Sequence, residues 1–526
     1  MKKSTFSVMG TIMLVLSMVL SACGSTSKEA QTQSASEKPK LLKVATAASV
    51  TTWDPSISVS TESAYLANIY EPLLWVNPPG SPEEFSPALA EKWEHSEDGK
   101  VWTFFIRKGV KFHDGADLNA EAVKKSIERT INIGKGSAYL WAPVEKMEVV
   151  DEYTLKFHLK YPIPFERIAG ASLAAWIMSP NVVDKDEAWF NEGHAAGTGP
   201  WKLESYKTDK EVLLTKNENY WGKVDTNFEK VFINIIAEDV VREQMLTSGA
   251  ADIAYTPIEN LKSLEQDPNI QIVRSLGYYN FVGFFNTKKP PLDNKLVRQA
   301  LSYAVDYDAI IEVATKGEAT QAKGPVPQGL WPSDPSLPSY SLNLEKAKEL
   351  LAQAAVNPAD LKLTLTYASE NMDEARFAPL IKEGLAKLGV SVNVEPIMWN
   401  QQWERGKGDP RTAQDIFILQ FWPSYADGYD NLKTMFSTEE RPHLNLAYYS
   451  NPDFDKMIRQ AYALSGTKKE EAKELYLQAQ NLLIDEAPAM FFYDRKEVVS
   501  MRNTITGDAA NPNYPYVTFF HKLKTK

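Results

Sequence analysis

Residue types that carry out covalent and metal chemistry are few in this chain and are not grouped for catalysis. The sequence holds a single cysteine, no Gly-x-Ser-x-Gly turn and no His-Glu-x-x-His pattern, so the usual nucleophile and zinc-hydrolase arrangements are missing. The six histidines are scattered without the paired spacing of a metal site. We expect no catalytic residue, no metal site and no cofactor. An extracellular hydrolase that uses two carboxylates remains the alternative of another class, because acidic residues are plentiful.

The single cysteine, Cys23, follows an apolar segment near the start of the chain. Lys2 and Lys3 precede an apolar run over residues 5–20, which is typical of a secretory signal peptide rather than of a permanent membrane span. Residues 20–23, Leu-Ser-Ala-Cys, resemble a bacterial lipobox. This resemblance implies cleavage before Cys23, a diacylglycerol on its sulfur, and an acyl chain such as palmitate on its new amine. We therefore expect a signal peptide over residues 1–22 and a lipoprotein anchored to the outer face of the cell membrane, on the periplasmic side where a second membrane exists.

The composition after Cys23 separates a tether from a globular body. Residues 23–40 are rich in Ser, Thr, Gln, Lys and Glu and have little to bury, so they predict a flexible, lipid-anchored tether. No later stretch reaches eighteen uninterrupted apolar residues. The 526 residues predict about two to four domains. The formal net charge of −11 argues against a nucleic-acid partner, which would need a basic surface.

The body alternates strand-like and helix-like segments, which predicts an α/β fold with mixed sheets. Expected strands cover residues 41–45, 101–106, 153–159, 202–206, 211–215, 231–236, 278–286, 361–367 and 390–396. Expected helices cover residues 119–130, 239–248, 293–305, 344–355 and 376–388. Asn119 is a plausible N-cap, and Gly249 and Gly389 are plausible helix stops.

Short motifs spread along the body occur in the order of one known family. They include Ile-Tyr-Glu-Pro-Leu-Leu at 69–74, Pro-Ala-Leu-Ala-Glu-Lys-Trp at 87–93, Gly-Thr-Gly-Pro-Trp at 197–201, Asn-Glu-Asn-Tyr-Trp-Gly at 217–222, Val-Arg-Gln-Ala-Leu at 297–301 and Asn-Pro-Asp-Phe-Asp at 451–455. Together these segments resemble the bacterial solute-binding proteins of the peptide, dipeptide and nickel uptake group, which form extracellular solute-binding protein family 5. The resemblance covers nearly the whole chain after the tether.

The resemblance implies a two-lobed, periplasmic-binding-protein-like fold with an additional subdomain and the ligand in the cleft between the lobes. Lobe I would comprise residues 41–70, 199–285 and 495–526, the additional subdomain residues 71–198, and lobe II residues 286–494. Such a protein captures a solute, a peptide foremost, by cleft closure and delivers it to an ABC permease, without catalysis and as a monomer. A nickel chelate, a sugar or an opine are the alternative ligands, and uptake is not separated from peptide signalling. His443 is the histidine to watch for a chelated metal.

The resemblance also implies where the cleft residues lie. Trp422 matches the tryptophan of a family segment, Trp-x-Ala-Asp-Tyr, whose aspartate pairs with a peptide ammonium. Two placements of that aspartate are open here: Ser424 stands in its place, or Asp427 approaches from a shifted backbone. Further candidate contacts are Tyr425, Trp399, Tyr139, Tyr279, Phe281, Trp53 and Glu62. Aromatic walls suit a binder of varied side chains, because rings offer contact area with few rotatable bonds.

Overall fold

The computed structural model describes residues 40–526, which pack as one unit. The predicted signal peptide, Cys23 and nearly all of the predicted tether lie outside the described residues. Within residues 40–526, none of the helices combines the length and the apolar character that a membrane crossing requires.

One large mixed sheet connects most of the strands, in the order β15-β14-β16-β12-β17-β11-β1-β10-β9-β8, with β13 paired to β17. β1 pairs in parallel with β10, and β14 with β15, whereas β12 is antiparallel to both β16 and β17. The predicted α/β class with mixed sheets is confirmed. The strands are β1 (Leu41–Thr46), β8 (Trp201–Lys207), β9 (Glu211–Lys216), β10 (Lys230–Ile235), β11 (Ile253–Ala254), β12 (Ile270–Phe285), β13 (Ala319–Gln321), β14 (Lys362–Ala368), β15 (Ser391–Ile397), β16 (Ile416–Phe421) and β17 (Ala489–Arg502).

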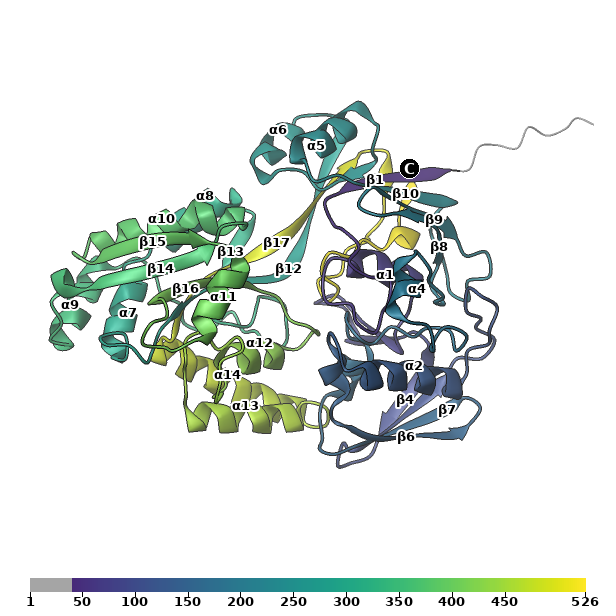
Figure 1. Cartoon of the computed structure of the whole chain (residues 1–526), viewed down its shortest axis with the longest axis horizontal. Helices are drawn as coiled ribbons and strands as arrows, with labels where there is room; N and C mark the ends of the chain where they lie inside the picture. Colours follow the sequence, from purple (N-terminus) through teal and green to yellow (C-terminus); the bar gives the residue numbers. More distant parts are fainter. Residues whose placement is uncertain (1–39) are drawn as a thin grey trace, which may run out of the picture. The chain divides into compact units, whose positions relative to one another are not determined.

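The two longest strands, β12 and β17, run side by side and link the two halves of this sheet (Figure 1). The first part of β12 pairs with the last part of β17, near β11 and β1, and the second part of β12 pairs near β16 and β14. The register shifts between Ser275 and Tyr279. At this shift, a Cβ atom on Gly277 would lie 2.4 Å from the Arg495 carbonyl oxygen, so glycine alone permits the close approach of the two strands.

Helices pack around the β14–β15–β16 end of the sheet and enclose a second core beneath it. They begin at ordinary caps: Asn294 accepts a hydrogen bond from Leu296 N, and Asn371 accepts from Asp373 N and Glu374 N. The Asn371 cap starts its helix four residues before the start expected from the sequence. These helices are α7 (Lys295–Tyr303), α8 (Tyr307–Thr315), α9 (Leu344–Gln353) and α10 (Met372–Ala386). The helices α11 (Trp399–Lys407), α12 (Gly428–Phe436), α13 (Pro452–Leu464) and α14 (Lys469–Glu486) pack instead in the larger core that also contains β1 and β10.

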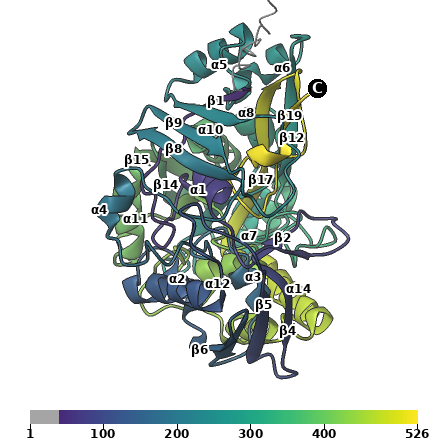
Figure 2. The same cartoon turned by 90° about the vertical axis from the view of Figure 1, so that its right-hand side faces the viewer.

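A separate four-stranded antiparallel sheet, in the order β4-β5-β7-β6, forms from residues 90–159 (Figure 2). Its strands are β4 (Ala90–His95), β5 (Val101–Ile106), β6 (Val144–Asp151) and β7 (Thr154–Leu159). α2 (Ala120–Ile133) contacts this sheet, begins at the Asn119 cap and ends at Gly134, which has the left-handed φ of 62°. Phe104, Phe157 and Phe165 pack ring against ring in the core beside it.

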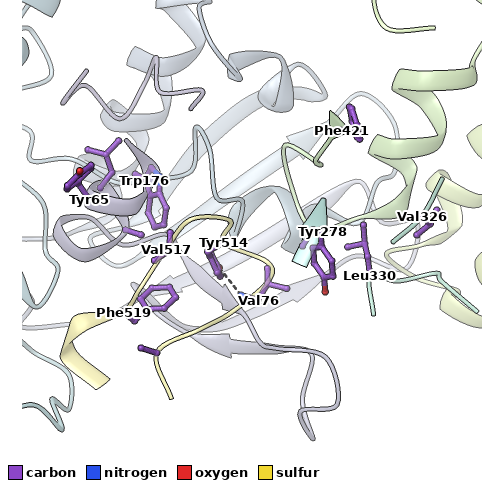
Figure 3. Close-up of a cluster of buried hydrophobic side chains, with 14 of the residues drawn as sticks. Tyr65, Val76, Trp176, Tyr278, Val326, Leu330, Phe421, Tyr514, Val517 and Phe519 are labelled. Carbon is purple, nitrogen blue, oxygen red and sulfur yellow. Dashed lines mark hydrogen bonds between the residues drawn. The ribbon is translucent and has the colours of Figure 1, made fainter. Parts of the chain in front are cut away.

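The last residues of the chain return to the segments that follow β1, as Figure 3 shows. The Tyr514 hydroxyl accepts a hydrogen bond from Val76 N at 3.0 Å and donates one to the Gly170 carbonyl at 2.9 Å. Phe519 packs on Trp75, so residues distant in sequence share one core. The remaining elements are α1 (Ser63–Ile69), α3 (Phe165–Ala169), α4 (Glu187–Asn191), α5 (Asp239–Ser248), α6 (Leu261–Leu264), β2 (Leu74–Val76), β3 (Phe85–Pro87), β18 (Ile505–Thr506) and β19 (Lys524–Thr525), with short 3₁₀ turns at Ala138–Trp141, Ile258–Asn260, Pro358–Asp360 and Phe520–Lys522.

Candidate functional site

A large cavity of about 1130 Å³ lies where β12 and β17 cross from one half of the sheet to the other. Its lining comes from distant parts of the chain: the loop around residue 139, the middle of both long strands, the segment after β16, and the starts of α10 and α11. This volume exceeds the roughly 300–1,000 Å³ of ordinary small-molecule sites. The cavity therefore has room for a ligand larger than a drug-sized molecule.

Four of the predicted contact residues line this cavity: Trp422, Trp399, Tyr139 and Tyr279. Tyr139 remains 51% exposed, whereas Tyr279 is almost fully buried at 5%. The structure thus brings together side chains from the 3₁₀ turn after α2, from β12, from the end of β16 and from the start of α11. Ser424 also lines the cavity, and its backbone N–H donates to Asp430 at 2.6 Å.

Three aromatic rings meet at one corner of the cavity. The ring centroids of Tyr279 and Tyr516 lie 5.3 Å apart, those of Trp422 and Tyr516 6.3 Å, and those of Tyr279 and Trp422 6.5 Å. The rings are tilted or nearly perpendicular to one another, which is the arrangement that aromatic pairs prefer. We call Tyr279, Trp422 and Tyr516 the aromatic corner.

Trp399 forms a second aromatic surface of the cavity, at the start of α11. Its ring stacks on Trp403 with the centroids 6.0 Å apart and the planes 10° apart. Its backbone N–H donates to the Glu370 carboxylate at 3.0 Å, which fixes the first turn of the helix. The Trp403 indole donates to the carbonyl of His443, another cavity residue.

Phe281 and Trp53 do not line the cavity; both side chains are fully buried in the core. Phe281 stacks on Tyr493 with centroids 4.5 Å apart. Trp53 packs edge-on against Tyr206 at 5.3 Å. In this structure both residues belong to the core and do not face the cavity.

Glu62 is fully buried and organises the loop that follows β1. Its carboxylate accepts hydrogen bonds from Thr51 Oγ1 at 2.7 Å, Ser58 Oγ at 2.9 Å, Val59 N at 2.7 Å and Ser60 N at 2.9 Å. Val59, which this set of bonds holds in place, lines the cavity. Glu62 therefore reaches the site only through the loop that it shapes.

Asp427 and Tyr425 lie behind the cavity wall rather than in it, and both are buried. Asp427 caps α12 by accepting from Tyr429 N at 2.8 Å, and its other oxygen lies 3.0 Å from Arg167 Nε. Arg167 also pairs with Glu84, which pairs in turn with Lys469. We call these four residues the buried ion network. It joins α3 and the β3 segment to α12 and α14.

The charges around the cavity form a second chain of ion pairs. Arg376 pairs with Glu259 and, at 3.0 Å, with Asp373, whose other oxygen lies 3.0 Å from Arg495 Nη1. All four side chains line the cavity. Among residues 40–526, no group of three His, Cys, Asp or Glu side chains is arranged to hold a metal ion.

The cavity residues that the sequence did not identify include Arg376, Arg495, Glu497 and Tyr516. One usable sign was the charged run Asp-Arg-Lys-Glu at residues 494–497, which interrupts an otherwise apolar strand. Tyr516 gave no such sign, because it lies in an irregular Asn- and Pro-rich segment without periodicity.

The α/β fold and the ligand-sized cavity at the strand crossing define a solute-binding protein with two lobes. Residues 84–442 match the family described as bacterial extracellular solute-binding proteins, family 5 (middle). The chain belongs to this family, and the family predicted from its motifs is confirmed.

Known proteins of similar sequence or structure agree with this assignment. The probable D,D-dipeptide-binding periplasmic protein of Escherichia coli (strain K12) is 31% identical over 432 residues, which cover 81% of this chain and 82% of the relative. Heme-binding protein A of Haemophilus influenzae is 32% identical over 508 residues, which cover 90% and 91%. The periplasmic binding protein DppA from Helicobacter pylori, solved in complex with the peptide STSA, superposes with a TM-score of 0.76 at 28% identity, over 92% of this chain and 98% of that one. The predicted two-lobed fold is confirmed.

The buried ion network predicts that Asp427→Asn destabilises the protein by about 3 kcal/mol, because it leaves the Arg167 charge buried without one of its partners. The asparagine retains the capping oxygen for α12, so the loss reports the charge and not the cap. Urea unfolding of wild type, Asp427→Asn and the exposed control Asp360→Asn measures it. Equal stability of the two variants would contradict this role for Asp427.

The buried carboxyl group of Glu374 should make the free energy of unfolding depend on pH. Burial, with smaller contributions from Asp373 and Glu370, raises the pKa of Glu374 to about 8, although the Ala368 N–H donated to its carboxylate opposes the rise. The folded state therefore holds this proton more tightly than the unfolded state, and its stability falls as pH rises from about 5 to about 8. Glu374→Gln removes this dependence.

We expect the stability of Glu374→Gln relative to wild type to increase by about 2 kcal/mol between pH 5 and pH 8. Unfolding curves at both pH values test this, with the exposed Glu345→Gln as the control of the same chemistry. Parallel pH profiles for wild type and Glu374→Gln would refute it.

Proposed function

We propose that this protein binds a peptide in the cavity and delivers it to an ABC importer. The observation that carries the proposal is the cavity itself: about 1130 Å³ at the crossing of β12 and β17, lined by aromatic rings and by charges of both signs. Rings receive side chains of varied shape, and paired charges of both signs suit a ligand that carries an amine and a carboxylate. The relatives include a probable dipeptide-binding protein and a protein solved with a peptide.

The proposed boundary between the two lobes lies at the crossing of β12 and β17. Lobe I comprises residues 41–70, 199–285 and 495–526, with the additional subdomain at 71–198, and lobe II comprises residues 286–494. The boundaries at 285 and 494 fall in or next to the two long strands, so β12 and β17 act as the hinge. A hinge made of a few strand residues permits closure on the ligand without unfolding either lobe.

The residues proposed to contact the peptide are Trp422, Trp399, Tyr139 and Tyr279, all of which line the cavity. Ser424 occupies the cavity wall where the family resemblance places an aspartate. The other predicted residues, Tyr425, Asp427, Phe281, Trp53 and Glu62, act on the ligand indirectly, by holding the walls. The protein works as a monomer that docks on the permease of the importer.

A thermal-shift screen of the purified mature protein tests the ligand class. The panel contains di- to hexapeptides, glutathione, hemin, nickel with histidine, and several oligosaccharides. A ligand at a hundred times its dissociation constant stabilises the folded state by roughly 2.7 kcal/mol, so a peptide should raise the melting temperature clearly. For a peptide that binds, Trp422→Ala should weaken the affinity about tenfold, by loss of a buried aromatic contact.

The matched control for Trp422→Ala is Trp189→Ala, which removes a half-buried tryptophan of α4 that is not part of the cavity lining. A melting-temperature rise only with a sugar or with nickel–histidine would refute the peptide assignment. Unchanged peptide affinity in Trp422→Ala would refute the placement of the ligand.

The lipid anchor is a separate part of the proposal, and it rests on the sequence around Cys23. We expect Cys23→Ala to move the protein from the membrane fraction to the soluble fraction, because each buried acyl methylene contributes roughly 0.8 kcal/mol to membrane attachment. Cell fractionation and labelling with a palmitate analogue measure this outcome. The neighbouring Ser21→Ala should leave attachment unchanged, and membrane retention of Cys23→Ala would disprove lipidation.

A further inference from the structure

One carboxylate of the cavity, Glu497, lies beside the aromatic corner. Arg495 and Glu497 are two residues apart on β17, so both side chains point to the same face of the sheet. Tyr279 on β12 is the direct neighbour of Arg495 across the ladder, and it therefore shares that face. All three residues line the cavity, and Glu497 is half-buried there.

Among the cavity carboxylates without an ion pair in the described chain, Glu497 is the one beside Tyr279 and Tyr516. The others, Glu370, Glu374 and Glu439, accept hydrogen bonds from backbone N–H groups elsewhere in the wall. Arg376 and Arg495 are matched by Glu259 and Asp373, which makes a neutral set of four charges. Lys496 points its ammonium to Glu318, 4.0 Å away. Glu497 forms no ion pair in the part of the chain that the structure describes.

Tyrosines surround this carboxylate. Burial, and after it the charge of Glu497, raises the pKa of Tyr516 to about 12 and that of Tyr255 above its usual range. Burial raises the pKa of the Glu497 carboxyl itself, while the positive charge of Arg495 and the nearby Tyr279 hydroxyl oppose the rise. Within the described chain the buried Tyr279 hydroxyl has no hydrogen-bond partner. Burial therefore disfavours the charged form of Glu497, and no cation of the described chain forms an ion pair with it.

An unpaired carboxylate next to three aromatic rings favours a ligand group that carries a positive charge. The face of an aromatic ring carries partial negative charge and attracts cations, the more strongly where water is excluded. A carboxylate beside such rings adds a full negative charge and accepts hydrogen bonds from N–H donors. Asp427, the acidic candidate that the sequence suggested, is already committed to Arg167.

We propose that Glu497 and the aromatic corner of Tyr279, Trp422 and Tyr516 bind a cationic group of the ligand. The shared chemistry is an ammonium or guanidinium, which a peptide carries either at its N-terminus or on a lysine or arginine side chain. This inference rests on the proposed peptide binding. It adds which group of the peptide, the N-terminal amine or a basic side chain, binds at the β17 side of the cavity.

Three probe peptides separate the sources: tetraalanine with a free amine, N-acetyl-tetraalanine, and N-acetyl-Ala-Lys-Ala-Ala. Their affinities are measured by titration calorimetry on the mature protein and on Glu497→Gln. Wild type should bind at least one of the two peptides that carry a cation about tenfold more tightly than N-acetyl-tetraalanine, which carries only the C-terminal carboxylate that all three share, as expected for a hydrogen-bonded charge. Glu497→Gln should lose this preference while its affinity for N-acetyl-tetraalanine stays the same.

The exposed Glu345→Gln on α9 is the matched control, and it should keep the wild-type preference. Glu497→Asp keeps the charge and should retain part of the preference, which a purely structural role of Glu497 would not require. Preference for free tetraalanine alone assigns the α-ammonium, and preference for the lysine peptide alone assigns a side chain.

Two outcomes overturn the inference while leaving peptide binding intact: equal affinity of wild type for all three peptides, or a preference that survives in Glu497→Gln. Failure of every peptide in the thermal-shift panel overturns the proposed function and this inference together.

Discussion

The backbone ladder between β12 and β17 is the constraint on which the rest of this structure depends. Each strand belongs to both halves of the large sheet, so the same hydrogen bonds that build the cores also join them. The register of the ladder shifts between Phe281 and Val282, and pairing is interrupted between Ser275 and Tyr279, where Gly277 lets the strands approach closely. A break in pairing is where a sheet bends most easily and where side chains are freed from packing. The cavity lies at this break.

Buried charge makes a second connection across the molecule, and its physics differs from that of the ladder. Arg167, Glu84, Asp427 and Lys469 come from four segments and pair with one another. Arg167 and Asp427 are buried, whereas Glu84 and Lys469 are partly exposed. Such a network contributes little net free energy, since desolvation offsets most of the attraction, but a misplaced partner is costly. It therefore fixes the position of α3 relative to α12 more than it stabilises the contact between them. Ser424 of the cavity wall, three residues before Asp427, is held separately, by its N–H donated to Asp430.

Local patterns in the sequence were sufficient for the family and for many of the elements, but not for β16, β17 or the helices α11 to α14, nor for the roles of the site residues. Asn119 marks the start of α2, and the alternation of residues 154–159 marks β7, because caps and pleat act within a few residues. The role of Asp427 depends on Arg167, far earlier in the chain, and no local pattern records that pairing. Glu497 likewise becomes a cavity residue only because β12 bulges beside it.

The aromatic residues of β12 show why a binding wall cannot be told from a core by alternation alone. Tyr279 and Phe281 point to the same face of the sheet and pair with successive same-face residues of β17, Arg495 and Tyr493. Over Phe281, α10 places Phe377 and completes a core. Tyr279 instead lies against Trp422, Tyr516 and the cavity, and the Tyr279 hydroxyl has no hydrogen-bond partner in the described chain. A scaffold residue and a site residue are therefore distinguished by whether helix α10 covers them. This depends on the tertiary structure, and two aromatic positions in one strand do not encode it.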